Sequence, residues 1–184
     1  MPRLPFPTDT DDFSDETRAA VRHIQKTRGS MPPPSSYLTY AGAAGERLSD
    51  LVEHLRYRTS LTPGESELAI CIAARAANAD YIWTAHVRLG LKAGTREEAI
   101  HAVDTYGPLD NLTADEALII RFGRELLEAP RVEDETFDAV RARWGEAGVL
   151  ELTAVMSVYM MNASILRVME HKAPDDARFL SPRT

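Results

Sequence analysis

The sequence predicts an all-α protein, and three observations lead to that class. Three segments begin with a threonine followed three positions later by a glutamate, at Thr62, Thr95 and Thr113, which is the capping-box pattern of a helix N-terminus. Apolar residues recur at intervals of three and four, as they do along one face of a helix. Alternation of apolar and polar residues over the length of a strand is not found. We therefore expect one helical domain over 14–184, preceded by an extended arm over 1–13.

The expected helices follow one another with recognisable ends. Ser14 caps a first helix that ends near Gly29. A proline-rich stretch over 31–36 is expected to be a surface linker, because each proline removes a hydrogen-bond donor and restricts the residue before it. A short helical segment over 37–44 and a stronger amphipathic helix after Gly45 come next. The remaining helices are expected at 63–78, 80–92, 96–106, 114–128, 134–144 and 147–171.

The last of these helices is apolar on nearly all sides. It carries four of the six methionines together with many leucines and valines. A helix without a polar face is buried on several sides, so we expect it at the centre of the core or at a contact between subunits.

Composition limits the possible functions. The chain has 184 residues, is 44% apolar and 27% charged, and has a net charge of −7. A negative charge does not favour partners such as nucleic acid or an anionic membrane. The N-terminal residues lack the apolar core of a signal peptide, and we expect no stretch to reach membrane-spanning length. A single cysteine, Cys71, excludes an intrachain disulfide and fits a reducing compartment, so a cytoplasmic location is expected.

Two polar residues are isolated on apolar helical faces. Glu67 shares its face with Ile70 and Cys71, and His86 shares its face with Ile82 and Trp83. Taken singly, Glu67 is more simply a stabilising charge in the first turn of its helix, and His86 a hydrogen-bonded core residue. A histidine with an ordinary pKa near neutrality is also suited to moving protons, and a buried carboxylate needs a partner.

Together with their neighbours these residues resemble a family. The motifs are Glu67-Leu-Ala-Ile, Tyr81-x-Trp83-x-x-His86, Gly90-Leu-x-x-Ala93-Gly94 and Glu97-Glu98. They are similar to the carboxymuconolactone decarboxylase family, which includes the alkylhydroperoxidase D-like proteins. The resemblance extends to segments 55–58, 113–127 and 148–159. It implies an alkylhydroperoxidase D-like helical bundle and a homo-oligomer, as a trimer or a hexamer.

The resemblance also divides the possible activities. The alkylhydroperoxidase D-like branch uses a CxxC pair ahead of the histidine, but Ala79 and Ile82 occupy those positions here, so that peroxidase activity is not expected. Cys71 has no resolving partner and is interpreted as a small buried residue rather than a nucleophile. The other branch usually has a glutamate at the position of Ile82, which makes a mechanism with a second carboxylate doubtful.

The site that remains has three catalytic candidates, His86, Glu67 and Tyr81. They suggest cofactor-independent decarboxylation or isomerisation of a small cyclic or unsaturated carboxylic acid. A non-catalytic or small-molecule-binding role is the alternative. No metal is expected, because the five histidines form no HxH or HxxxH arrangement. The residues expected to bind the substrate are Trp83, Ile82, Cys71 and Asn78.

Overall fold

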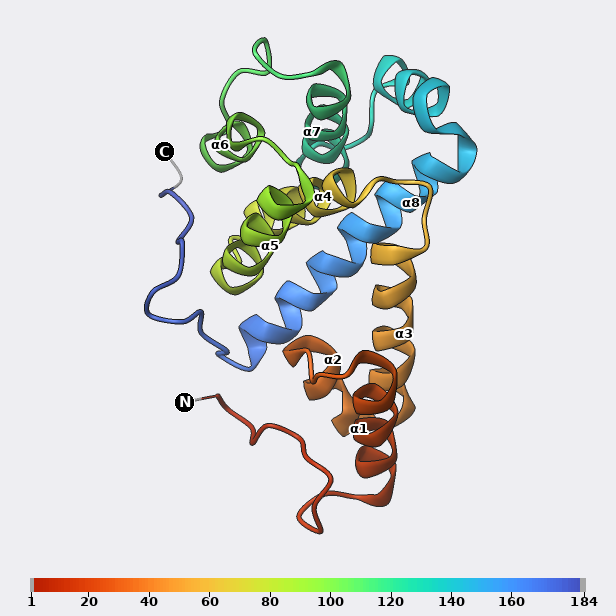
Figure 1. Ribbon diagram of the computed structural model, residues 1–184, viewed down its shortest axis with the longest axis vertical. Helices are drawn as coiled ribbons and strands as arrows, with labels where there is room; N and C mark the ends of the chain where they lie inside the picture. Colours follow the sequence, from red (N-terminus) through yellow and green to blue (C-terminus); the bar gives the residue numbers. More distant parts are fainter. Residues whose placement is uncertain (1, 183–184) are drawn as a thin grey trace.

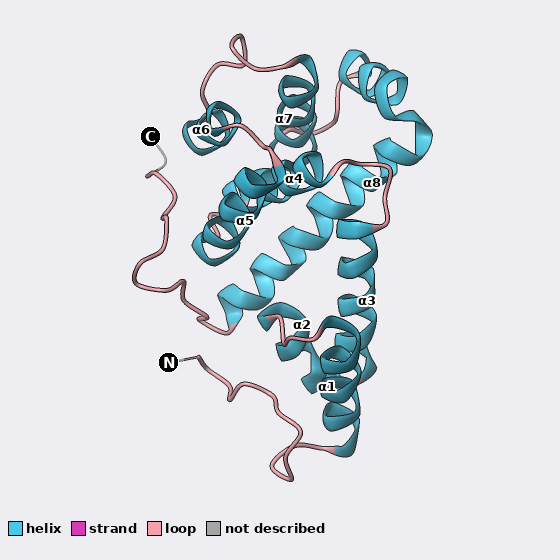
Figure 2. Cartoon of the chain, in the orientation of Figure 1, coloured by secondary structure: helices cyan, strands magenta, loops and turns pink. Residues whose placement is uncertain are grey.

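The protein is built from helices. The computed structural model describes residues 2–182, and within that range it contains no strand (Figure 2). Eight α-helices and one short 3₁₀ helix follow in the order α1 (Asp15–Arg28), α2 (Pro33–Leu38), η1 (Thr39–Ala41), α3 (Ala43–Tyr57), α4 (Pro63–Ala76), α5 (Asp80–Ala93), α6 (Glu97–Thr105), α7 (Ala114–Glu128) and α8 (Asp134–Val168). The predicted fold class is confirmed.

Helix α8 crosses the middle of the molecule, between the region of α1, α2 and α3 and the region of α4 to α7 (Figure 1). It packs against α4 and α7 on one side and against α2 and α3 on the other. Gly145 interrupts it with φ 72° and ψ −178°, a left-handed φ that glycine adopts without strain. The expected break between helices at 144 and 147 is therefore confirmed, although the helix ends at Val168 and not at position 171.

Helix α4 is the most enclosed helix. Every residue from Ser66 to Arg75 is buried, and α4 contacts α5, α6, α7 and α8 as well as α3. Its N-terminus is fixed by the capping box that the sequence predicts, in which Thr62 and Glu65 satisfy each other's backbone amides, with Pro63 as the first helical residue. Glu67, one turn further on, is thereby brought into the interior.

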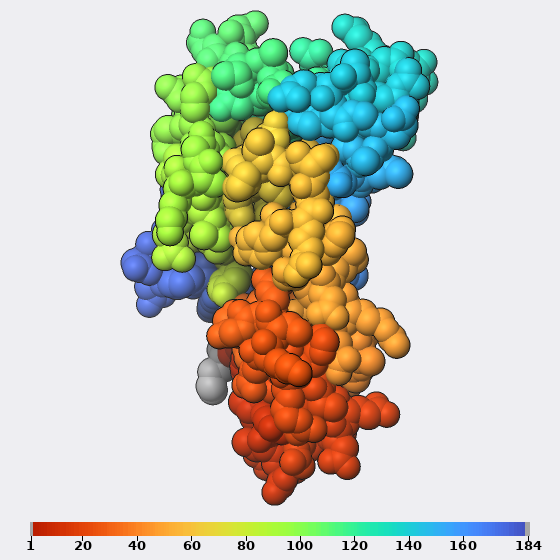
Figure 3. All heavy atoms as spheres, turned by 45° about the vertical axis from the view of Figure 1, so that its right-hand side comes forward, coloured from red at the N-terminus to blue at the C-terminus, as the bar shows by residue number. Residues whose placement is uncertain are grey.

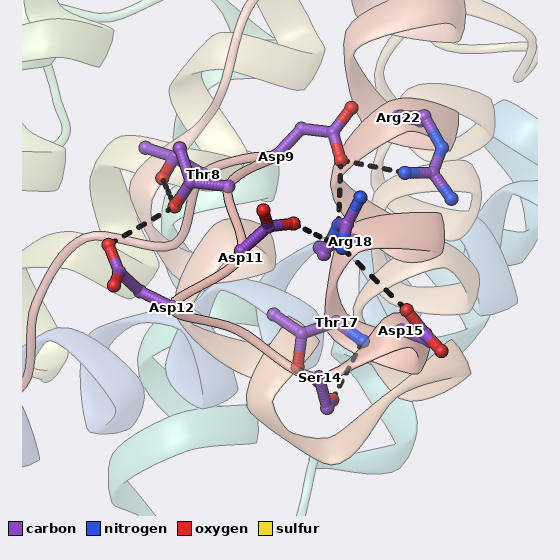
Figure 4. A network of polar contacts seen from close by, with 10 residues as sticks. Thr8, Asp9, Asp11, Asp12, Ser14, Asp15, Thr17, Arg18 and Arg22 are labelled. Atoms are coloured by element: carbon purple, nitrogen blue, oxygen red, sulfur yellow. Dashed lines mark hydrogen bonds and ion pairs between the residues drawn. The ribbon is translucent and has the colours of Figure 1, made fainter.

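The N-terminal part packs beneath the α4 and α5 region, in red and orange in Figure 3. Residues 2–13 form no helix, and two of their aspartates form ion pairs with arginines of α1. Asp9 binds both Arg18 and Arg22, and Asp11 binds Arg18 (Figure 4). These pairs are largely exposed and stabilise the arm only weakly.

Two local predictions are wrong. Residues 33–36 belong to helix α2, because prolines are compatible with a first helical turn, where backbone N–H groups have no partner in any case. Thr95 does not cap helix α6, which begins after Arg96 without a side-chain cap. The Thr95 hydroxyl instead donates to the carbonyl of Gly64 at 3.0 Å, so it joins the start of α4 to the end of α5.

The chain after α8 turns back along α5 and α6 (Figure 1). The backbone N–H of Leu180 donates to Asp80 at 2.9 Å, and that of Ser181 donates to Asp104 at 2.9 Å. Arg178 pairs with Glu97. The C-terminal tail is therefore tied to the surface of the bundle.

Helix α8 is long and apolar enough, by length and composition, to cross a membrane, which corrects the expectation that no stretch reaches that length. Half of its most apolar window is buried inside the fold. The core helix of a soluble protein passes the same test, and α8 packs against α2, α3, α4 and α7.

Candidate active site

Glu67 and His86 meet at the contact between α4 and α5. The Nδ1 atom of His86 lies 2.6 Å from Oε2 of Glu67, and the two residues are 8% and 6% exposed. The helices approach closely here because α5 has Gly90 beside Glu67. A Cβ added to Gly90 would lie 3.4 Å from Cβ of Glu67 and 3.2 Å from the Thr95 hydroxyl. The spacing of nineteen residues in the sequence thus becomes a direct hydrogen bond.

Helix α3 supplies a second partner for the same carboxylate. Nη2 of Arg56 donates to Oε1 of Glu67 at 2.6 Å, and the two side chains are 11% and 8% exposed. Glu67 therefore uses one oxygen for each partner. The Nε atom of Arg56 is buried and has no hydrogen-bond partner among the described residues.

Helix α8 places Tyr159 against the histidine. The two rings are 4.9 Å apart between centroids and nearly perpendicular, at 81°. Burial raises the pKa of Tyr159, so its hydroxyl stays neutral and can act as a hydrogen-bond donor.

The charges of the pair follow from these contacts. Burial favours the neutral form of Glu67, but His86 and Arg56 outweigh it and hold the pKa of the carboxyl below its ordinary value. Burial lowers the pKa of His86, and Arg56 lowers it further, against the opposing influence of Glu67. At neutral pH Glu67 is therefore ionised and His86 is neutral. In that state Nδ1–H of His86 donates to Glu67 and leaves the Nε2 lone pair available.

A cavity of about 610 Å³ opens beside this pair. Helix α5 forms one wall with Tyr81, Ile82 and His86, and α3 contributes Arg56. The proline-rich residues before and within α2 also line the cavity. The wall carries many polar and charged side chains, and a cavity of this volume is large enough for a small polar molecule.

The fold is shared with solved structures of low sequence identity. An alkylhydroperoxidase AhpD core protein from Ralstonia eutropha JMP134, described as an uncharacterized peroxidase-related protein, has a TM-score of 0.72 at 18% identity. The match covers 95% of this chain and 93% of that one. A peroxidase-related protein from Silicibacter sp. TM1040 has a TM-score of 0.73 at 13% identity, covering 96% and 93%. The chain has the alkylhydroperoxidase D-like fold.

A third match with this fold is the debrominase Bmp8 in complex with 2,3,4-tribromopyrrole, with a TM-score of 0.70 and 12% identity over 95% of both chains. No protein-family model matches the sequence, and no curated protein matches it significantly. These likenesses establish the alkylhydroperoxidase D-like fold and not an activity.

This alkylhydroperoxidase D-like chain has no CxxC pair, because its one cysteine is Cys71. Cys71 is fully buried in α4, and burial raises its pKa well above the ordinary value, so it carries no thiolate at neutral pH. It does not contribute to the wall of the cavity. Trp83 is also fully buried and lies outside that wall.

The other predicted site residues differ in whether they line this cavity. His86, Tyr81 and Ile82 line the cavity, whereas Glu67 lies behind His86. Asn78 is not in this wall but lines a second cavity of about 410 Å³ near the end of α8. Tyr81 belongs to both cavities and packs edge-on against His171, with ring centroids 4.8 Å apart.

Sequence reasoning missed three residues that the structure adds to the site, namely Arg56, Tyr159 and Asn162. Arg56 and Tyr159 lie in segments that share the family resemblance, but nothing in the spacing indicates that their side chains reach Glu67 and His86. Asn162 follows Tyr159 by one helical turn, and its buried Oδ1 has no partner among the described residues. An unpaired buried amide beside a cavity is visible only in three dimensions.

No three histidine, cysteine, aspartate or glutamate side chains within residues 2–182 are grouped closely enough to hold a metal ion.

Proposed function

We propose that this protein is a cofactor-independent enzyme that moves a proton on a small cyclic or unsaturated carboxylic acid, with His86 as the base. The observation that carries the proposal is the direct bond from Nδ1 of His86 to Glu67, at 2.6 Å, in the wall of a cavity. A neutral histidine anchored through one ring nitrogen offers the other as a base, and general base catalysis contributes about 10²–10⁴-fold in rate.

The charges at the cavity favour an acidic substrate. Arg28 and Arg88 both line it, and Arg88 has no ion-pair partner among the described residues. The one carboxylate in the wall, Glu53, is already paired with Arg58 at 3.0 Å. A positive field at the entrance attracts a carboxylate and raises its local concentration.

The steps of the reaction follow from the resting protonation state. Nε2 of His86 takes a proton from a carbon activated by the substrate's carbonyl group or double bond, and the electron pair of that C–H bond passes into an enolate. A neutral phenol, Tyr81 or Tyr159, donates a hydrogen bond to the enolate oxygen. The imidazolium then returns its proton to another carbon, which completes an isomerisation without an outside proton.

Decarboxylation fits the resting state less well. Loss of CO₂ breaks the bond to the carboxylate carbon and leaves its electron pair on the substrate, so a proton must be supplied from elsewhere. A neutral His86 holds no such proton until it has bound one from solvent. Isomerisation is therefore the form of the proposal that we favour.

Deuterium exchange tests the proposal without knowledge of the product. The protein is incubated in D₂O with a panel of small unsaturated and cyclic carboxylic acids, and replacement of C–H by C–D is followed by proton NMR. At least one acid should exchange, and His86→Gln should exchange it about 10²–10⁴-fold more slowly. His54→Gln, a change at an exposed histidine on α3, serves as the control. Exchange by His86→Gln at the wild-type rate would contradict the proposal.

A second candidate function is small-molecule binding without catalysis. It is favoured by the absence of the thiol pair and by Ile82 at the position where an acid is usual. A closed gap beside the pair would have supported this alternative, but a cavity of about 610 Å³ meets His86. Tight binding of an acid with no deuterium exchange in any member of the panel would support binding alone.

We further propose that the chain forms a homo-oligomer, a trimer or a hexamer. The supporting observation is an exposed apolar line along α8, formed by Leu150, Met161 and Val168, which are 69%, 42% and 52% exposed. These positions recur at intervals that keep them on one side of the helix, and burying such a face between copies is favourable.

A further inference from the structure

Arg56 stands out among the groups around His86 because it is buried, charged and not needed to transfer a proton. It reaches Glu67 from α3, eleven positions earlier in the chain, and binds the oxygen that His86 does not use. We propose that Arg56 is a positioning residue that keeps His86 in the neutral form by balancing the charge of Glu67. The inference rests on the proposed function only for its effect on catalysis, since the protonation of His86 can be measured alone.

A count of charges gives the physical reason. With Arg56 present, the buried group of three has charges of +1, −1 and 0, and protonating His86 would leave one uncompensated positive charge. Without Arg56, the pair of Glu67 and His86 has a net charge of −1, and protonation would make it neutral. Burial penalises net charge, so removing Arg56 reverses the preference of the site for a proton.

The bonding geometry allows Arg56 to act in this way. Both bonds to Glu67 are 2.6 Å long and end on different oxygens, so they form together without competition. The guanidinium also fixes the rotation of the carboxylate, which keeps Oε2 directed at Nδ1. The proton of neutral His86 is thereby held on Nδ1, and Nε2 stays free.

Other groups around the cavity do not replace this role. Among the described residues, the side chain of His86 forms a hydrogen bond only with Glu67, which accepts it. Arg28 and Arg88 add positive charge at the cavity wall, but their contacts are with Ser49 or solvent. The remaining groups that line the site carry no free charge, because Tyr81 and Tyr159 are neutral and Glu53 is paired with Arg58.

The test is a proton NMR titration of His86 in the full-length protein without any substrate. The signal is assigned by its loss in His86→Gln. Arg56→Gln removes the charge but keeps a donor for Glu67, and it should raise the proton affinity of His86 about tenfold or more. Arg56→Lys keeps the charge and should leave the affinity near that of the wild type.

Arg47→Gln is the matched control. It makes the same charge change on the same helix, α3, at an exposed side chain that does not line the cavity. Its effect on His86 should be small because solvent screens the charge. A rise in proton affinity in Arg56→Gln alone supports the inference. No rise in Arg56→Gln, or an equal rise in Arg47→Gln, overturns it.

The wild-type protein gives a second measurement in case Arg56→Gln does not fold. The inference requires wild-type His86 to titrate below the ordinary value of about 6.5, and a midpoint above that value overturns it. Neither result depends on a substrate, so failure of the inference is distinct from failure of the proposed function. Where exchange activity is found, Arg56→Gln should lose activity at neutral pH and recover it at more alkaline pH.

Discussion

The substitution Glu67→Gln probes both the stability and the chemistry of the buried site. It preserves the size of the side chain and removes its charge. Arg56 would keep an acceptor, but its charge would no longer be balanced. The amide NH₂ group would donate to Nδ1 of His86, which forces the ring proton onto Nε2. We therefore expect a less stable protein whose histidine has lost its function as a base.

The magnitude follows from the burial of the pair. Removing one partner of a buried ion pair costs about 3–5 kcal/mol. Arg56 and Glu67 are 11% and 8% exposed, which places them near that buried limit. Each retained hydrogen bond offsets about 0.5–1.5 kcal/mol. The net loss in the free energy of unfolding is then about 2 kcal/mol, and Tm falls by roughly 4–8 °C for a chain of this length.

Urea unfolding at neutral pH, followed by circular dichroism, measures this loss. Glu151→Gln is the control, because Glu151 also lies in an apolar helix but accepts its hydrogen bonds from Ser60 at the surface. Its loss should be about 1 kcal/mol or less. Equal losses for the two variants would refute the buried ion pair. Nitrogen-15 NMR of His86 should show the proton on Nδ1 in the wild type and on Nε2 in Glu67→Gln.

Three further predictions follow from the packing and the charges. The free energy of unfolding should rise with pH through the acid range, because His86 and Glu67 both have pKa values below the ordinary 6.5 and 4.5, so the unfolded chain binds more protons. Urea titrations should show this rise, and a free energy of unfolding that falls between about pH 4 and pH 7 would contradict it. Gly123→Ala should cost about 1–3 kcal/mol by the same method, because the added Cβ would lie 2.6 Å from Cγ2 of Ile72. Light scattering should give a trimer or a hexamer that Met161→Glu dissociates, and a wild-type monomer would contradict the proposed assembly.

The sequence predicts the helices well where a local signal decides the structure. Thr62 and Thr113 cap their helices as expected because both partners of each box lie within one turn. Thr95 has the same pattern, but a contact with Gly64, thirty-one positions away, takes its hydroxyl. A capping box is therefore predictable only where no tertiary partner competes for the side chain.

The candidate site shows the same limit. Glu67 and His86 are found from their spacing and from the family resemblance, since both belong to one pair of adjacent helices. Arg56 is not found, because its pairing depends on how far a long side chain reaches from α3 into the contact of two other helices. From the sequence alone, Tyr159 is expected to be one more core residue of the apolar helix α8. Spacing within an element is visible in the sequence, whereas the meeting of side chains from different elements is not.

Part of the cavity wall comes from a segment of the chain that lies far from His86 in the sequence. Pro32, Pro33, Pro34 and Ser35 contribute to it, yet none of them contacts Glu67 or His86 through a hydrogen bond. The residues that would move the proton and the residues that shape the space around the ligand are thus encoded in different segments. Substitutions in the N-terminal segment should alter which acids are accepted while leaving the acid–base pair intact. If the proposed function holds, selectivity and reactivity would be set by different segments of this chain.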